Sequence, residues 1–508
     1  MSEHYAIPNS LLPKSNTFVN LYEVDSLNVG ISNFEIYLSN EPEVIAARQR
    51  IYNDILMNPK LIELLEKLEE KVINVAELQK KTGTEYDTET LLYAILDMRL
   101  FCDTISFVKS ELSPFVEQRQ ITSPELIRFV DACCEFERGE QYREAFNWLN
   151  RLNDNLNLIK SVTLGANLDS QLKIREIGIV SINMQPYVSK KFMDSIFRDE
   201  NVPDEYKCIA SLGIHETKSM LGHKSVSVNN ELFSAMNTCY RSLFKHMRKD
   251  LIDSFKDQII AVSGILDDLD FIIRSSKYLR MISAAGGKLT FPEIADTTEI
   301  RGLYLPQLLS RLRREQIVEN DVKINDDNRC FFLTGPNNGG KSVYLNSIGI
   351  AQLMFQLGLP IPAEAGKMQI FDTIATLYVH DTKHINEGRL ADEVQRLKAC
   401  LDCLKGRSLL LLDETFSGTS AFDGVFLAES LVKYLYKNGI CMYYITHFHE
   451  LTQKIAELNA DGSNIIMLTA ENADGRRTYK IVPWSGSVTE TSLAKDIVID
   501  HGLGFLFE

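Results

Sequence analysis

The run Gly335-Pro-Asn-Asn-Gly-Gly-Lys-Ser342 has the residue types and spacing that bind the phosphates of a nucleotide. It matches GxxxxGK[ST], follows an apolar stretch and precedes a helical pattern. Glycines let backbone N–H groups turn toward phosphate oxygens, and a helix N-terminus adds partial positive charge. In such a loop Lys341 reaches the β- and γ-phosphates, and the Ser342 hydroxyl binds Mg²⁺. The predicted nucleotide-binding residues here are Gly335, Pro336, Asn337, Asn338, Gly339, Gly340, Lys341 and Ser342.

A second motif places two acids at the end of an apolar stretch, Leu409-Leu-Leu-Leu-Asp-Glu414. Asp413 can hold Mg²⁺, directly or through water, and Glu414 can polarise an attacking water as a general base. An apolar run that ends in two acids is common by itself. Its position after a phosphate-binding loop favours the catalytic interpretation.

A third motif, Thr446-His447, follows the next apolar stretch. A polar residue there can sense the γ-phosphate. A histidine in an arbitrary chain is more often an ordinary surface or core residue, but its place in the order of strands favours the sensor interpretation. His449, two residues later, has no such support.

Strands and helices alternate around these three motifs. The expected strands are Cys330–Thr334, Leu409–Leu412 and Met442–Thr446, with helical patterns between them. This βαβ order is typical of a parallel sheet that is buried on both faces. We therefore predict a doubly wound α/β domain.

The chain before this domain has mainly helical periodicity, from about residue 41 to 157. A second helical pattern begins near Asn229 and its apolar residues step by three or four to Ile273, with only Gly264 intervening. A helix this long is a lever, a coiled coil or an ordinary helix of a bundle. Between the two patterns, 161–165 and 178–182 are rich in β-forming residues.

Composition and charge narrow the class of protein. The 508 residues are 45% hydrophobic and 24% charged, as in ordinary soluble globular proteins. No stretch of apolar residues is long enough to span a membrane, so we expect no membrane partner and a cytoplasmic location. The nine cysteines are scattered, and Cys400-x-x-Cys403 has no second pair at zinc spacing, so we expect no metal or redox role for it.

The net charge of -15 argues mildly against a protein coated in nucleic acid, because phosphate binding needs Lys and Arg. The charge is uneven, however. Residues 151–250 contain 14 Lys and Arg against 11 Asp and Glu. This middle region is the one candidate for an electrostatic contact with nucleic acid, and it is weakly basic.

The motifs together resemble those of the MutS family of DNA mismatch-repair proteins. The phosphate loop has the form Thr-Gly-Pro-Asn-x-Gly-Gly-Lys-Ser of that family, and the similarity is strong from about residue 280 and weaker from about 40 to 280. The other segments that carry the resemblance are Asp413-Glu-Thr-Phe-Ser-Gly-Thr-Ser-Ala-Phe-Asp-Gly424, Thr446-His-Phe-His-Glu-Leu-Thr452, Leu164-Gly-Ala-Asn-Leu-Asp169 and Tyr479-Lys-Ile-Val-Pro483.

The resemblance implies a dimer with two ATP sites, each completed by a loop from the partner. It implies that Ser342 and Asp413 are the Mg²⁺ positions, Glu414 the catalytic base and His447 the sensor. It also implies an adenine-side loop at Asn320-Asp321. The residues that it places at the dimer contact are Ser417, Gly418, Thr419 and Ser420.

Two departures from the family concern the ATP site. The family commonly stacks an aromatic residue on adenine just before Asn-Asp, whereas this chain has Ile317 there, which would weaken stacking to apolar contact. The loop that reaches the partner commonly carries a serine. In Asn386-Glu-Gly-Arg-Leu390 that place falls at Gly388, so its backbone N–H, or the charge of Arg389, would replace the hydroxyl.

A third departure concerns DNA. Mismatch-repair members begin with a mismatch-reading domain and a connector, whereas the helical core begins here almost at once. The triplet Phe115-Val-Glu117 matches the Phe-x-Glu wedge but lies in a helical stretch after Pro114, so we expect no base-stacking role for it. The DNA-gripping clamp insertion is also short.

The sequence therefore predicts an N-terminal all-helical core and lever region followed by a P-loop, ABC-type, doubly wound α/β ATPase domain. The expected divisions are an arm at 1–35, a helical core with lever helices and a shortened clamp at 36–280, and the ATPase domain at 281–508. The predicted function is that of an ATPase using ATP and Mg²⁺, a homodimer that closes on duplex or branched DNA without mismatch preference. The alternative is an ATP-driven switch that grips a protein or RNA assembly.

Overall fold

The computed structural model describes residues 6–82, 91–157, 161–172, 174–183, 249–336, 339–378, 389–416, 418–446, 448–473 and 476–484. The chain divides into two units, each considered by itself below. The first comprises residues 1–11, 63–120 and 126–269, and the second comprises residues 12–62, 121–125 and 270–508. The division falls inside three helices, α2 (Pro59–Thr82), α5 (Pro124–Arg138) and α9 (Leu266–Ala284).

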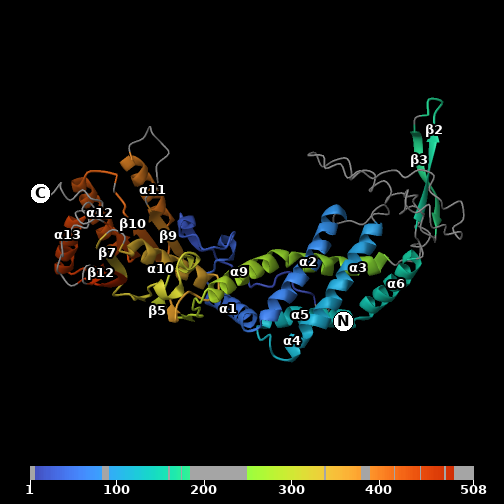
Figure 1. Cartoon of the computed structure of the whole chain (residues 1–508), viewed down its shortest axis with the longest axis horizontal. Helices are drawn as coiled ribbons and strands as arrows, with labels where there is room; N and C mark the ends of the chain where they lie inside the picture. Colours follow the sequence, from blue (N-terminus) through green and yellow to red (C-terminus); the bar gives the residue numbers. More distant parts are fainter. Residues whose placement is uncertain are drawn as a thin grey trace, which may run out of the picture. The chain divides into compact units, whose positions relative to one another are not determined.

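The first unit has a helical core in which α3 packs against α6 and α8 (Figure 1). Aromatic rings from four helices meet there. Phe255 lies edge-on to Phe101 and Phe136, with ring centroids 5.7 and 5.3 Å apart, and stacks on Tyr142. The elements of the described part are α2 (Pro59–Thr82), α3 (Leu91–Phe107), the π-helix η3 (Val108–Leu112), α4 (Ser113–Glu117), α5 (Pro124–Arg138), α6 (Glu140–Asn157), β2 (Ser161–Leu168), β3 (Ile174–Asn183) and α8 (Lys249–Gly264).

The expectation of an all-helical region is wrong between residues 161 and 183. Strands β2 and β3 form an antiparallel two-stranded sheet there, with Ser161 opposite Asn183. The β-forming residues of the two segments explain the difference, because β-branched side chains are stiff in helices and suit strands.

The predicted long helix is two helices over the described residues. Helix α8 ends at Gly264 and α9 (Leu266–Ala284) begins after Ile265. Gly264 lies close to another segment, since an added Cβ would be 3.1 Å from the backbone oxygen of Asn9. Helix α9 ends at Ala284, two residues before Gly286, which has a left-handed φ of 80°.

The second unit is built on a seven-stranded sheet with the order β1-β9-β10-β11-β7-β12-β13 (Figure 1). All neighbouring pairs are parallel except β12 and β13. The predicted βαβ order is confirmed. The strands are β1 (Asn20–Tyr22), β9 (Thr373–Tyr378), β10 (Ser408–Asp413), β11 (Cys441–Ile445), β7 (Cys330–Thr334), β12 (Ile465–Ala473) and β13 (Arg476–Pro483).

Helices cover both faces of this sheet. Apolar residues of α11 (Arg389–Cys403), α12 (Ala421–Lys437) and α13 (His449–Ala460) share one core with Phe332, Leu410 and Tyr444. On the other face, α10 (Lys341–Gln356) brings Tyr344 against Tyr443, which stacks on Phe331 at 4.4 Å between ring centroids. Alternate residues of each buried strand therefore serve the two cores.

The N-terminal segment packs into the second unit. Strand β1 pairs with β9 in parallel, and Asn20 lies opposite Thr373 in the register. The buried Arg48 donates to the carbonyl oxygens of Pro13 and Tyr37, and Tyr37 stacks on Phe271. The short elements here are η1 (Val24–Leu27), η2 (Glu35–Tyr37) and α1 (Pro42–Met57).

A second, four-stranded sheet lies in the same unit, with the order β4-β8-β5-β6. Its elements and the adjoining short helices are β4 (Glu293–Ile294), β5 (Thr298–Leu303), η6 (Pro306–Ser310), η7 (Arg314–Gln316), β6 (Asn320–Ile324) and β8 (Ala365–Met368). Across the described residues, no helix is long and apolar enough to cross a membrane.

A candidate nucleotide site at the carboxyl ends of β7 and β10

The loop between β7 and α10 ends in a helix N-terminus that can receive an anion. Gly335 and Gly340 have φ angles of 115° and 93°, which favour glycine over residues with a Cβ. In the described part of the loop, no side chain caps α10 at Gly340. The first N–H groups of a helix lack partners within the helix, so they can bind phosphate oxygens here.

Lys341, the first residue of α10, is buried and folds back over the loop. Its Nζ atom donates to the carbonyl oxygens of Gly335 at 2.8 Å and Pro336 at 2.9 Å. Burial lowers the pKa of this ammonium, while nearby Glu414 and Asp413 raise it. The cation therefore lies near both acids of the second motif.

Asp413 is the last residue of β10, and it lies beside Ser342 of α10. Burial raises the pKa of Asp413, a hydrogen bond from Ser342 lowers it, and the charge of Glu414 raises it again. The structure thus brings together four of the residues predicted from sequence, Lys341, Ser342, Asp413 and Glu414.

The chain turns sharply after Asp413. Glu414 and Phe416 have left-handed φ angles of 53° and 66°, and such angles cost a residue with a Cβ roughly 1–3 kcal/mol each. The turn is held in part by a hydrogen bond from the N–H of Glu414 to the carbonyl oxygen of Ile445, at 2.9 Å. Phe416 is buried in the core beneath α12.

The oxygen atoms at this point suit a magnesium ion. Mg²⁺ prefers oxygen ligands and is commonly bound by one or two carboxylates together with substrate phosphates. A hydroxyl of Ser342 hydrogen-bonded to the carboxyl of Asp413 is such a donor set. In the part of the chain that the structure describes, no group of three or more His, Cys, Asp and Glu could hold a metal by itself.

Comparison with known proteins assigns this region to a family. Residues 331–490 match the family model MutS domain V. This part of the chain belongs to the MutS family. A DNA mismatch repair protein MutS from Macrococcus caseolyticus is 26% identical over 335 residues, which are 64% of this chain and 36% of that protein.

Two further relatives agree with this assignment. MutS from Fervidobacterium nodosum is 34% identical over 186 residues, 36% of this chain and 22% of that protein. DNA mismatch repair protein MSH3 from Phaeosphaeria nodorum is 27% identical over 313 residues, 60% of this chain and 27% of that protein. The matched region therefore spans about a third or less of these relatives.

The adenine-side residues implied by the MutS resemblance have other partners in the structure. Ile317 is 6% exposed, so little of its side chain is free to contact a base. The side chain of Asn320 bonds β13, accepting from Ile481 N at 2.8 Å and donating to the oxygen of Tyr479 at 3.3 Å. Asp321 accepts from the N–H of Gly302.

An aromatic residue that the sequence did not single out as a site residue, Tyr479, lies next to the phosphate loop. Tyr479 is 47% exposed and has a left-handed φ of 59°. A Cβ built on Gly340 would be 3.5 Å from its ring, so Tyr479 lies directly against the phosphate loop. The MutS-like run Tyr479–Pro483 is the available signal in the sequence, but the resemblance alone assigns no site role to Tyr479.

Tyr378, also missed from sequence, lies beside the acids. It is the register partner of Asp413 in the parallel pair β9 and β10. Its hydroxyl donates to Asn346 of α10 at 2.8 Å. The charge of Asp413 adds to burial in raising the pKa of Tyr378. No sequence motif marks it.

The residues implied at the MutS dimer contact are only partly visible. Ser420 caps α12, accepting from the N–H of Asp423 at 3.2 Å and donating to its carboxylate at 2.7 Å. Gly418 and Thr419 lie in the preceding turn, and Arg389 begins α11. The predicted residues Asn337, Asn338, Gly388, Ser417 and His447 lie outside the described residues.

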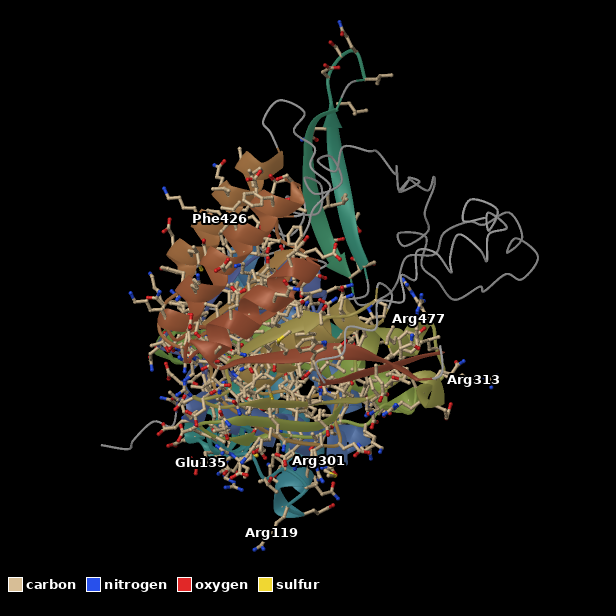
Figure 2. The ribbon with its side chains drawn as sticks, turned by 90° about the vertical axis from the view of Figure 1, so that its left-hand side faces the viewer. Arg119, Glu135, Arg301, Arg313, Phe426 and Arg477 are labelled. Atoms are coloured by element: carbon tan, nitrogen blue, oxygen red, sulfur yellow. The ribbon has the colours of Figure 1, made fainter. Side chains whose placement is uncertain are left out.

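Two phenylalanines follow Ser420 on the outer face of α12. Phe422 is 84% exposed and Phe426, which is labelled in Figure 2, is 64% exposed. They are four residues apart and thus share one face of the helix. Exposed aromatic residues that adjoin one another are typical of a contact surface.

Proposed function

We propose that this protein is a Mg²⁺-dependent P-loop ATPase that works as a homodimer closing on DNA. The observation that carries the ATPase is the joint placement of Lys341, Ser342, Asp413 and Glu414 around one helix N-terminus. Each supplies a different requirement of phosphoryl transfer: a cation for phosphate, two oxygen ligands for the metal, and a carboxylate for the attacking water.

Each residue of the site would have a separate role. The N–H groups at the start of α10 and the ammonium of Lys341 bind and orient the phosphates. Ser342 and Asp413 hold Mg²⁺, which when bound offsets the negative charge of the phosphates. Glu414, at the end of β10, accepts a proton from the water that attacks the terminal phosphate. Tyr479 lies where a base attached to those phosphates would contact it.

Dimerisation and DNA binding are supported by different observations. The exposed Phe422 and Phe426 adjoin the residues that the MutS resemblance places between subunits. The relatives matched over parts of this chain are named DNA mismatch repair proteins. ATP binding in composite sites would draw two subunits together, and closure around DNA would retain it.

A second candidate is an ATP-driven switch that acts on a protein or RNA assembly. The net charge of -15 favours it, because duplex DNA attracts basic surfaces and repels acidic ones. The two candidates share the ATPase and differ in the ligand. ATP-dependent retention on a panel of duplex, branched and RNA substrates separates them, and retention on RNA alone would replace DNA with the second candidate.

The ATPase is tested by Glu414→Gln, which keeps the shape of the side chain and removes its basicity. We expect ATP binding to persist and hydrolysis to slow by roughly 10²–10⁴-fold, the usual contribution of a general base. Glu457→Gln is the matched control, because Glu457 is exposed on α13 and pairs only locally with Lys454. Equal turnover by Glu414→Gln and wild type would exclude Glu414 as the base.

A further inference from the structure

A buried pair of hydroxyl groups lies behind the turn that carries Glu414. Thr415 Oγ1 donates to the hydroxyl of Tyr444 at 2.8 Å, and that hydroxyl donates in turn to the carbonyl oxygen of Thr415 at 3.4 Å. Thr415 is 6% exposed and Tyr444 is fully buried. Tyr444 therefore bonds both the side chain and the backbone of a single residue.

That residue is the centre of a strained turn. Glu414 and Phe416, on either side of Thr415, have left-handed φ angles of 53° and 66°. Residues with a Cβ rarely adopt this conformation, and it persists where the surroundings hold it. The hold on Thr415 comes from Tyr444 in the middle of the sheet, and the backbone N–H of Glu414 donates to the carbonyl oxygen of Ile445.

We infer that Tyr444 is a positioning residue for ATP hydrolysis: its hydroxyl, bonded to Thr415, fixes the turn and so aims the Glu414 carboxylate at the attacking water. This inference rests on the proposed ATPase. Tyr444 is fully buried, so its effect on hydrolysis passes through Thr415. Burial raises the pKa of the Tyr444 hydroxyl, so it keeps the proton that it donates.

The neighbouring Tyr443 provides a matched comparison. It is also fully buried in β11, but successive strand residues point to opposite faces, and Tyr443 stacks on Phe331 beneath α10. Tyr444 belongs to the core beneath α12, together with Phe416. Removing either hydroxyl leaves a buried ring of nearly the same volume, but only the change at residue 444 reaches the turn.

The first experiment compares Tyr444→Phe with Tyr443→Phe in the full chain, by steady-state ATPase kinetics and nucleotide titration. We expect kcat of Tyr444→Phe to fall about tenfold or more, since small displacements of a catalytic group are costly, with the ATP Kd unchanged. Tyr443→Phe should keep the wild-type kcat. Equal kcat values for both variants, or a loss of ATP affinity in Tyr444→Phe, would overturn the inference.

The second experiment repeats Tyr444→Phe in the Glu414→Gln background. If Tyr444 acts by aiming the carboxylate, it has nothing to position once that group is gone, so the residual kcat of Glu414→Gln should not fall further. Residues that act as one unit are non-additive in this way. A further tenfold fall would mean that Tyr444 acts elsewhere, and the inference would be wrong.

A third pair of variants tests the same contact from its other end and guards against misfolding of Tyr444→Phe. Thr415→Ser keeps the donor hydroxyl and should keep most of the wild-type kcat, whereas Thr415→Val removes it and should match Tyr444→Phe. Equal kcat values for Ser and Val at this position would contradict the inference. Absence of hydrolysis by the wild type would instead refute the ATPase and, with it, this role for Tyr444.

Discussion

Nζ of Lys341 lies 2.8 Å from the carbonyl oxygen of Gly335, the first residue of the loop that Lys341 closes. A second bond reaches Pro336 at 2.9 Å, so the buried ammonium is bonded to the backbone of its own loop. In the proposed ATPase, phosphate oxygens would replace these carbonyl oxygens as acceptors for the ammonium. Nucleotide binding would thus exchange neutral acceptors for charged ones, which form stronger hydrogen bonds.

The first prediction concerns this exchange. Lys341→Met should weaken MgATP binding about 10- to 150-fold, because a hydrogen bond to a charged group contributes roughly 1.5–3 kcal/mol. Ligand binding stabilises the native state, so wild type should gain about 2.7 kcal/mol at 100 times its Kd, and the variant far less. Urea unfolding with and without MgATP measures both. Lys433→Met is the control, because the Lys433 side chain is 51% exposed on α12.

The second prediction concerns the adenine base of ATP. If Tyr479 stacks on it, Tyr479→Ala should weaken ATP binding by about 1–3 kcal/mol, while Tyr479→Phe should bind like wild type. Inorganic tripolyphosphate has no base, so its affinity should be the same in all three proteins. Competition titrations with both ligands give the comparison. Wild-type ATP affinity in Tyr479→Ala would place the base elsewhere, and Ile317 would again be the candidate.

The local parts of this site could be predicted from sequence, and the parts made by distant segments could not. The loop before Lys341 and the acids after β10 are each encoded by a short run of residues, so their types and spacing sufficed. Tyr479 meets Gly340 across 139 positions, and Tyr444 meets Thr415 across 29, through a strand pairing that no periodicity reveals. The same reason explains β1, whose register with Thr373 could not be derived from the unpatterned N-terminal segment.

The third prediction concerns that N-terminal segment. Arg396 of α11 bonds both carboxylate oxygens of Glu23, and it also donates to the carbonyl oxygen of Tyr378 at 2.9 Å. The Arg396 and Glu23 side chains are 17% and 24% exposed. Glu23→Gln should therefore lower the free energy of unfolding by about 1–3 kcal/mol, more than an exposed pair would.

Urea unfolding of Glu23→Gln against Glu457→Gln checks this expectation. The Glu457 side chain is 66% exposed and pairs with Lys454 on the surface of α13, where a lost ion pair costs about 0–1 kcal/mol. Equal losses in the two variants would show that the pair with Arg396 adds no more than a surface contact.

The fourth prediction concerns assembly. ATP should tighten a homodimer of the Glu414→Gln protein, and Phe422→Ser should weaken that dimer, because this side chain is 84% exposed beside Ser420. Tyr434→Ser is the control: Tyr434 is also exposed on α12, but it lies about 18 Å farther along the helix. Sedimentation at micromolar protein, with and without ATP, measures the equilibrium. A monomer under both conditions would refute the composite site.

The last prediction concerns the DNA ligand. A wedge that reads mismatches must unstack a base step, which costs a few kcal/mol, and must be held in a groove to recover that cost. The triplet Phe115-Val-Glu117 does not meet this requirement. It forms most of the short helix α4, where Phe115 is half-buried and Ser113 donates to the Glu117 carboxylate at 3.3 Å. We therefore expect binding without mismatch preference.

What would hold DNA is the modestly basic region 151–250, of which residues 184–248 lie outside the described part. Lysines there can contact phosphates, and phosphate contacts position a protein without reading sequence. Binding should be weak and steeply salt-dependent. Lys190→Glu with Lys191→Glu should reduce the slope of log K against log salt concentration by about two, which is about one for each lost phosphate contact. The same reversal at Lys60 and Lys67, which are exposed on α2, is the charge-matched control.

The deciding comparison is the affinity for a G·T duplex against its matched twin, with a branched junction as the third ligand, at one fixed salt concentration. A junction offers a shape that a closing dimer can encircle, so we expect it to bind best and the two duplexes to bind alike. A tenfold preference for the mismatch, about 1.4 kcal/mol, would contradict this prediction. It would mean that residues interpreted here as structural core read the mismatch, and Phe115 would be the first of them to substitute.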